Sequence, residues 1–163
     1  MACRAVHFAL TSEEQATLLE TEATENEDLL DVIGEIEERW DQEWLLETDK
    51  AWDAIHRCLT GGTLDYGETP LHYAILGKSN LYNGEDYIIS YISPEEVVAC
   101  AAAIKDIDKI WMRDKYGAID DADYVGVLSD EDFEYTWSNF GELKAFYQKA
   151  AEHNRSVVFT VDQ

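Results

Sequence analysis

The chain is poor in positive charge. Of its 163 residues, 12 are Lys or Arg and 35 are Asp or Glu, which gives a formal net charge of −23 at pH 7. Such a charge repels nucleic acid phosphates and anionic lipids, so we expect no direct nucleic acid binding and no membrane association. This charge favours a partner with a basic protein surface, because electrostatic attraction raises the rate of association. The sequence does not predict an oligomeric state.

Cysteine is also scarce, and long apolar runs are missing. Cys3, Cys58 and Cys100 are odd in number, far apart and without a Cys-x-x-Cys pair, which argues against a disulfide framework and a zinc site. The first apolar run ends at Leu10, close before Glu13, which leaves no room for a signal-peptide core. No later run approaches the ~18 apolar residues needed to span a bilayer. We therefore expect a cytoplasmic protein.

Motifs for familiar chemistry are absent. The sequence contains no Gly-x-Gly-x-x-Gly, no phosphate loop, no His-Glu-x-x-His and no Gly-x-Ser-x-Gly. Dinucleotide, nucleoside triphosphate, zinc-peptidase and α/β-hydrolase functions therefore lack support, and we expect no cofactor. The acidic runs 120–123 and 129–132 do not match a calcium loop with its central glycine and final glutamate, so we expect no metal site.

The sequence does contain enough apolar material for a core. Hydrophobic residues make up 46% of the chain and aromatic residues 12%, including five Trp and nine Tyr. A chain of this length buries roughly 70% of its unfolded surface as one domain. No repeat or linker divides it. We predict a single domain over 1–163 that includes an acidic helical region at about 11–48.

A core helix is predicted over 49–62. Five apolar residues fall on one face at helical spacing: Ala51, Ala54, Ile55, Cys58 and Leu59. Thr48 or Asp49 is placed to cap its first amides, and Gly61 or Gly62 to end it in the left-handed conformation. We expect Trp52, Ile55 and Leu59 to be buried against two strands at 71–76 and 87–92.

The other elements follow from periodicity and capping signals. Strands are predicted at 5–10, 71–76, 87–92 and 156–161, with the middle two forming a hairpin. Capping boxes at Thr11–Glu14 and Thr24–Glu27 precede two helices, the second at about 27–39. The inward residues predicted for these two helices are Ala16, Leu19, Ala23, Leu29, Ile33, Ile36 and Trp40.

The strongest helix start is Ser93-Pro94-Glu95-Glu96. The residues expected to face inward from there on are Val97, Cys100, Ala101 and Ile104, then Ile107, Ile110 and Trp111, then Phe133, Trp137, Phe140, Leu143, Tyr147 and Ala150. An acidic loop is predicted between about Gly117 and Asp130. The mixture of elements predicts an α+β class with a small mixed β-sheet packed against several helices.

The negative charge is concentrated in the first helical region. Between Glu13 and Asp49 there are fifteen acids and one base, Arg39. A binding face for a basic partner is one interpretation, and the residues that we assign to it are Glu35, Glu37, Glu38 and Asp41. A merely solvated face is the alternative.

Candidate catalytic residues are few. Asp49 and Asp53 are four residues apart, so in a helix both side chains lie on one face. If a cleft covers them, they are able to share the roles of acid and base. His56 and His72 are the candidates for proton transfer. The structural alternative makes Asp49 a cap, pairs Lys50 with Asp53 or another acid, and leaves both histidines as hydrogen-bonded core residues.

Four segments resemble a known family. Asp49-Lys50-Ala-Trp52-Asp53-Ala-Ile-His56, closing on Leu59-Thr60-Gly61, is similar to the signature of the YfbM-like proteins, a bacterial domain family of unknown function. Segments 70–77, 91–97 and 140–151 follow in the same order, so the resemblance spans about 49–151. Two features differ: Met1-Ala2-Cys3 replaces the Met-Gly opening, and no Tyr-Pro segment with a following Trp comes after Tyr116. The resemblance implies a compact α+β domain and no catalytic residue.

Two function classes follow from the sequence. The first is a small acidic binding protein that occupies a basic protein surface, as a toxin-immunity protein or a charge-mimic inhibitor does. The alternative is an enzyme acting on a small molecule with a carboxylate/histidine site. A pocket lined by the candidate carboxylates would favour the second class.

Overall fold

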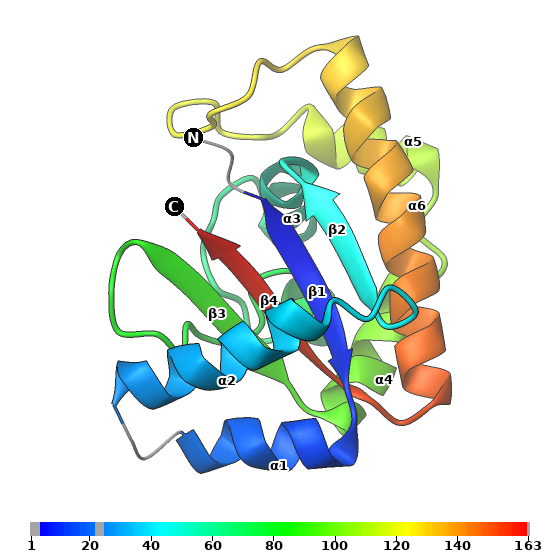
Figure 1. The fold of residues 1–163 in the computed structure, drawn as a ribbon. Helices are drawn as coiled ribbons and strands as arrows, with labels where there is room; N and C mark the ends of the chain where they lie inside the picture. The colour runs from blue at the N-terminus through cyan, green and yellow to red at the C-terminus, as the bar shows by residue number, and fades with distance from the viewer. Residues whose placement is uncertain (1–3, 22–24, 163) are drawn as a thin grey trace.

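The computed structural model describes residues 4–21 and 25–162 and contains a four-stranded sheet covered by helices on both faces (Figure 1). Its strands are β1 (Ala5–Leu10), β2 (Leu45–Asp49), β3 (Tyr87–Ile92) and β4 (Ser156–Asp162), in the order β2-β1-β4-β3. All three strand pairings are antiparallel. The predicted α+β class is confirmed, but the sheet is antiparallel rather than mixed.

The central strands are buried on both faces. Successive side chains of β1 point to opposite sides, so Ala5 and Ala9 enter one core cluster while Val6 and Phe8 enter the other. Every residue of β1 is buried. A strand covered on both sides needs apolar residues at nearly every position, which explains its uninterrupted apolar run.

One face of the sheet is covered by α1 (Ser12–Glu20) and α2 (Asn26–Arg39). The capping box at Thr11 and Glu14 is confirmed, but Leu18 is the buried residue of α1, in place of Ala16 and Leu19. The α2 residues predicted to face inward are confirmed as buried: Leu29, Ile33 and Ile36. Trp40 is partly exposed. Ala23 and Thr24 lie outside the described residues.

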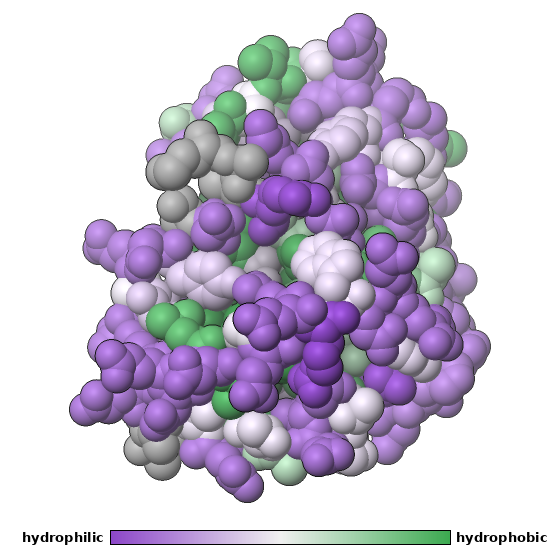
Figure 2. Space-filling model, in the orientation of Figure 1, coloured by the Kyte–Doolittle hydropathy of each residue, from purple (hydrophilic) through white to green (hydrophobic). Residues whose placement is uncertain are grey.

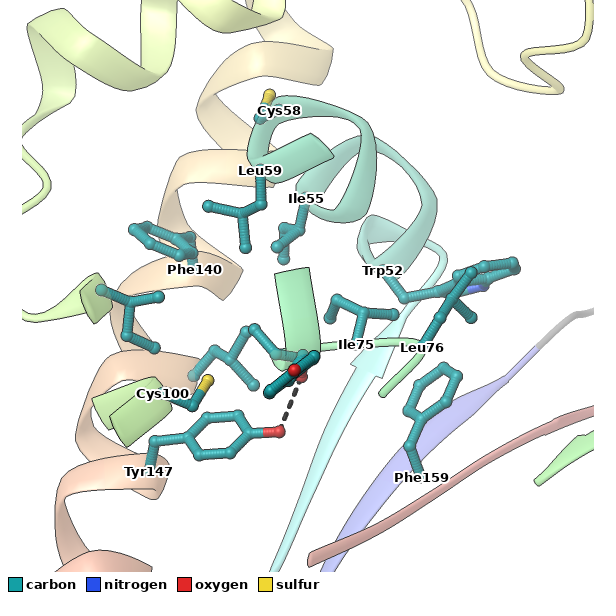
Figure 3. Packing of buried hydrophobic residues seen from close by; sticks show 14 of the residues in the cluster. Trp52, Ile55, Cys58, Leu59, Ile75, Leu76, Cys100, Phe140, Tyr147 and Phe159 are labelled. Atoms are coloured by element: carbon teal, nitrogen blue, oxygen red, sulfur yellow. Dashed lines mark hydrogen bonds between the residues drawn. The ribbon is translucent and has the colours of Figure 1, made fainter. Parts of the chain in front are cut away.

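The other face carries a larger helical layer. It contains α3 (Ala51–Thr60), the short 3-10 helix η2 (Pro70–Tyr73), α4 (Pro94–Ile104), α5 (Lys109–Tyr116) and α6 (Asp130–Glu152). Figure 3 shows α3 directing Trp52, Ile55 and Leu59 into this core, so their predicted burial is confirmed, although the segment 71–76 beside them is not the expected strand. The Trp52 ring lies 6.0 Å from the ring of Phe159 on β4.

The start of α3 differs from the prediction. Residues 45–49 form strand β2 beside β1, which the sequence analysis missed. Asp49 has a left-handed backbone (φ 45°), so it ends β2 and does not cap α3. The residue before α3 is Lys50, whose side chain makes no cap hydrogen bond within the described chain. Gly61 ends the helix in the left-handed conformation, as predicted (φ 92°).

The strand predicted at 71–76 is wrong. Pro70 opens η2, and the residues after it form turns deep in the core. Side chains replace a strand partner here: the Ala74 carbonyl accepts hydrogen bonds from His7 Nε2 at 3.0 Å and from the Tyr147 hydroxyl at 2.8 Å. Figure 3 shows the bond of Tyr147 as a dashed line. With no strand at 71–76, the predicted hairpin does not form, and β3 pairs with β4.

The later helices confirm most of the predicted core. The residues of α4 and α6 predicted to face inward are buried, except Trp137, which is partly buried: Val97, Cys100, Ala101, Ile104, Phe133, Phe140, Leu143, Tyr147 and Ala150. The prediction for α5 is confirmed in part: Ile107 and Trp111 are partly buried against this core, but Ile110 is 81% exposed. Met112 and Tyr116 are the buried residues of this helix. Within the described ranges, no helix is both long and apolar enough to cross a membrane.

Replacing Ser93 with alanine should destabilise the protein by about 1 kcal/mol. The Ser93 hydroxyl accepts a hydrogen bond from the Glu96 amide at 3.2 Å, and the Glu96 carboxylate accepts one from the Ser93 amide at 3.0 Å. Urea denaturation measures the loss. The matched control is Ser138→Ala at an exposed position inside α6, which removes no cap. Equal midpoints for the two variants would contradict the role of the cap.

Candidate functional site

A cavity of about 420 Å³ opens where the end of β2, the start of α3, the loop before α6 and the first turns of α6 meet. Figure 1 shows these segments at the same end of the molecule. The lining residues are Asp49, Lys50, Trp52, Asp53, Tyr124, Val125, Gly126, Asp132 and Tyr135. The structure therefore brings the predicted carboxylates Asp49 and Asp53 together in one cavity.

Three carboxylates line the cavity, those of Asp49, Asp53 and Asp132. The first two are each held by one hydrogen bond to one oxygen. Asp53 Oδ1 accepts a hydrogen bond from Arg57 Nε at 2.5 Å, one helical turn further along α3. Asp49 Oδ2 accepts one from the Tyr135 hydroxyl of α6 at 2.7 Å. The predicted pairing of Asp53 with Lys50 is thus replaced by a pairing with Arg57.

Asp132 holds two tyrosines on one oxygen. Its Oδ2 accepts hydrogen bonds from the Tyr116 hydroxyl at 2.6 Å and from the Tyr124 hydroxyl at 2.7 Å. Tyr116 belongs to α5 and Tyr124 to the loop before α6. Asp132 therefore ties together the three segments that close this side of the cavity.

Arg57 connects the cavity wall to the core. Its side chain is 2% exposed, and its Nη1 donates to the Asp120 carbonyl at 3.1 Å. The guanidinium carbon lies 5.7 Å from the centre of the Tyr124 ring. Nη2 has no hydrogen-bond partner among the described residues. Arg57 fixes the Asp53 carboxylate and the loop to the same helix.

Two glycines let the loop approach closely. Gly62 has φ 103°, and a Cβ there would lie 2.6 Å from the Ala118 carbonyl oxygen. The Gly62 carbonyl accepts from the Asp120 amide at 3.1 Å. A Cβ on Gly126 would lie 2.7 Å from the Tyr124 hydroxyl oxygen. A larger residue at Gly62 would displace the loop backbone at Ala118, and one at Gly126 would displace the Tyr124 ring.

The ionisation of the site follows from burial. Desolvation raises the pKa of Asp53, the bond to Arg57 and its positive charge oppose that shift, and the charge of Asp132 adds to it. Burial and the bond to Asp49 raise the pKa of Tyr135 to about 12. Burial, followed by the bond to Asp132, raises the pKa of Tyr124 further. At neutral pH both tyrosines therefore keep their protons and act as hydrogen-bond donors.

The two candidate histidines do not line this cavity. His56 is fully buried, and its Nε2 donates to the Asp65 carbonyl at 2.8 Å. Burial lowers the pKa of His56 to about 4. His72 is partly buried in η2, with no hydrogen bond to Nδ1 among the described residues. The structure thus separates the predicted carboxylates from the predicted histidines.

The four residues of the predicted acidic face are divided between two sides of α2. Glu35 and Asp41 line a groove of about 440 Å³ between α1, α2 and the end of β1, and Glu38 is exposed. Glu37 turns toward the sheet, where its Oε1 accepts from the Tyr87 hydroxyl at 2.6 Å. Figure 2 shows this face of the molecule as largely hydrophilic.

Several residues of the cavity were not found from the sequence. Tyr124, Asp132 and Tyr135 come from a loop and a helix start more than 70 residues after Asp49. The one local signal is tyrosine within an otherwise acidic stretch. Across residues 4–21 and 25–162, no group of three or more His, Cys, Asp or Glu is placed to hold a metal ion.

Stability should fall in acid partly through His56. Because its Nε2 donates to a carbonyl, a second proton would charge the buried Nδ1, which lacks a partner in the described structure. Its folded pKa of about 4 lies below the unfolded value of 6.5, so the unfolded chain binds more protons between these values. The neutral His56 therefore contributes its full stabilisation above pH 6.5, and this stabilisation is lost as the pH falls toward 4. The loss reaches about 2 kcal/mol at pH 5.

The His56→Gln variant tests this linkage. Glutamine keeps a donor for the Asp65 carbonyl but does not titrate, whereas every other titrating group is the same in both proteins. The free energy of unfolding of the wild type minus that of the variant should therefore decrease by about 2 kcal/mol from pH 7 to pH 5 in urea titrations. Parallel pH profiles for the two proteins would contradict it.

Comparison with known proteins supports the fold and the family. The structure of YfbM from Escherichia coli, a protein of unknown function, is similar with a TM-score of 0.70 at 19% sequence identity, over 99% of each chain. No curated protein matches the chain. The family described as "Domain of unknown function (DUF1877)" matches residues 1–160. The resemblance to YfbM-like proteins is thus confirmed and extends beyond residues 49–151, and the chain belongs to the DUF1877 family.

Proposed function

We propose that the protein binds a positively charged group, an ammonium or a guanidinium, in the cavity between α3 and α6. The observation that carries this proposal is the lining itself, which combines three carboxylates with three aromatic residues. Lys50 is the one basic residue among these lining residues, which therefore carry a formal charge of −2. A cation is the ligand that such a lining attracts.

The hydrogen-bonding capacity of the cavity supports the same ligand. The bonds described above use Oδ1 of Asp53 and Oδ2 of Asp49 and Asp132. The other oxygen of each carboxylate accepts no hydrogen bond from the described residues, so a ligand with several N–H groups satisfies them. Trp52, Tyr124 and Tyr135 add aromatic rings, whose faces attract cations.

The rest of the charge fits a protein whose ligand is cationic. A net charge of −23, with Glu35, Glu38 and Asp41 exposed on or beside α2, raises the local concentration of cations and speeds the approach of a basic partner. A cytoplasmic acidic protein that occupies a basic protein surface, of the immunity or charge-mimic type, is the role that we favour. In that role, the cavity holds one cationic side chain of the partner.

Calorimetric titration with methylguanidinium tests the proposal, with methylurea as the uncharged ligand of the same shape. Methylguanidinium should bind and methylurea should not. Asp49→Asn should weaken binding by about three- to tenfold, and Lys50→Gln should strengthen it by a similar factor, because one charge a few ångströms away contributes about 1 kcal/mol when water screens the interaction.

These two substitutions form a matched pair of opposite sign at adjacent positions. Asparagine tolerates the left-handed backbone of Asp49 and still accepts the Tyr135 hydrogen bond, so the change is confined to charge. Equal binding of methylguanidinium and methylurea, or an unchanged affinity in both variants, would overturn the proposal.

A small-molecule enzyme is the second candidate, favoured by the raised pKa of Asp53 beside the charge of Asp132. Two carboxylates whose environments separate their pKa values are able to divide acid and base roles. Incubating the protein with a bound guanidinium or amine compound and following the compound by NMR separates the two functions. A binding protein returns the compound unchanged, whereas turnover that Asp53→Asn abolishes would favour the enzyme.

A further inference from the structure

The loop before α6 exposes two valines beside the cavity. Val125 is 94% exposed and Val127 is 80% exposed. Figure 2 shows hydrophobic surface over this loop, at the upper edge of a largely hydrophilic view. Val125 belongs to the rim of the cavity, because it lines the opening while remaining almost fully accessible. An apolar rim therefore adjoins an acidic, aromatic interior.

A small ligand inside the cavity leaves part of this rim uncovered. Val127 is not among the lining residues, so a molecule confined to the cavity does not shield it from water. Removing apolar surface from water is favourable. To cover Val127, a partner must extend beyond the opening of the cavity. The occupant must then combine a cationic group with adjoining apolar groups.

The rim is held in a defined place relative to the carboxylates. Tyr124 precedes Val125 and is bonded to Asp132, and Gly126 packs against the Tyr124 ring. Asp120, earlier in the loop, is bonded through its carbonyl to Arg57. A partner therefore meets the valines and the carboxylates as one preorganised surface, which lowers the entropic cost of binding.

We infer that the natural occupant is an arginine side chain of a protein partner, flanked in the partner's sequence by apolar residues that cover Val125 and Val127. This inference rests on the proposed function. Arginine fits better than lysine, because its planar guanidinium has five donors for several carboxylate oxygens and stacks on aromatic rings. Residues next to the arginine in an extended segment lie a few ångströms from it and reach the rim.

Three blocked peptides separate the contributions: Ile-Arg-Ile, Gly-Arg-Gly and Ile-citrulline-Ile. Citrulline keeps the shape of arginine without its charge. On the wild-type protein, Ile-Arg-Ile should bind about tenfold more tightly than Gly-Arg-Gly, because the isoleucines bury apolar surface on the rim. Ile-citrulline-Ile should bind at least tenfold more weakly than Ile-Arg-Ile.

The double variant Val125→Ser/Val127→Ser should remove the roughly tenfold advantage of Ile-Arg-Ile and change the affinity for Gly-Arg-Gly by less than about twofold, since Val125 contributes only apolar rim surface. Both positions are highly exposed, so the fold is retained. Val98→Ser is the matched control, because Val98 is an exposed valine of α4 that does not line the cavity. It should keep the full advantage.

The outcomes distinguish the two proposals. If both arginine peptides bind with equal affinity, or if the advantage survives in the double variant, the apolar rim is not part of the site and the inference fails while cation binding stands. If methylguanidinium binds but neither arginine peptide does, the occupant is a small cation and the inference also fails. If neither methylguanidinium nor any arginine peptide binds, both proposals fail.

Discussion

The cavity depends on one buried guanidinium. Arg57 is almost inaccessible to water, and a buried charge is tolerated when it is paired and hydrogen-bonded. Its partners come from two places, the Asp53 carboxylate one turn earlier on α3 and the Asp120 carbonyl of the distant loop. Removing one partner of such a pair costs about 3–5 kcal/mol, so the helix and the loop are held in one arrangement.

A second set of contacts completes the site from the other side. Asp132 lies in the first turn of α6 and accepts hydrogen bonds from tyrosines of α5 and of the loop. The sheet contributes through β2, where the left-handed backbone of Asp49 turns the chain into α3. Asp49 and Asp53 thus face one cavity from different elements, whereas their spacing suggested a single helix face.

Local signals in the sequence were sufficient for some elements. The capping boxes at Thr11 and Ser93 and the periodicity of α6 are properties of short segments, and they appear in the structure as predicted. The run at 71–76 was misread because a buried turn and a buried strand need the same apolar residues. Its carbonyls are satisfied by His7 and Tyr147, which are distant in the chain, and no pattern inside the run reveals that.

Only part of the candidate site could be predicted from the sequence, because its residues come from segments that are distant in the chain. Asp49 and Asp53 were found because they are close together in the sequence, but the cavity exists because the loop and α6 fold over them. The histidines were chosen for their chemistry, and the structure uses His56 to hold the Asp65 carbonyl. Tertiary contacts between distant segments decide which polar residues share a cavity, and a single sequence does not encode them locally.

The central claim is that the cavity between α3 and α6 accepts a guanidinium, and the indole of Trp52 reports on it directly. The protein has five tryptophans, of which Trp52 lines the cavity and Trp44 lines the groove beside α2. In a ¹⁵N-labelled sample titrated with N-acetylarginine methylamide, the Trp52 indole resonance should shift saturably while that of Trp44 stays unchanged. An unmoved Trp52 resonance at saturating ligand, or a shift confined to Trp44, would contradict the claim.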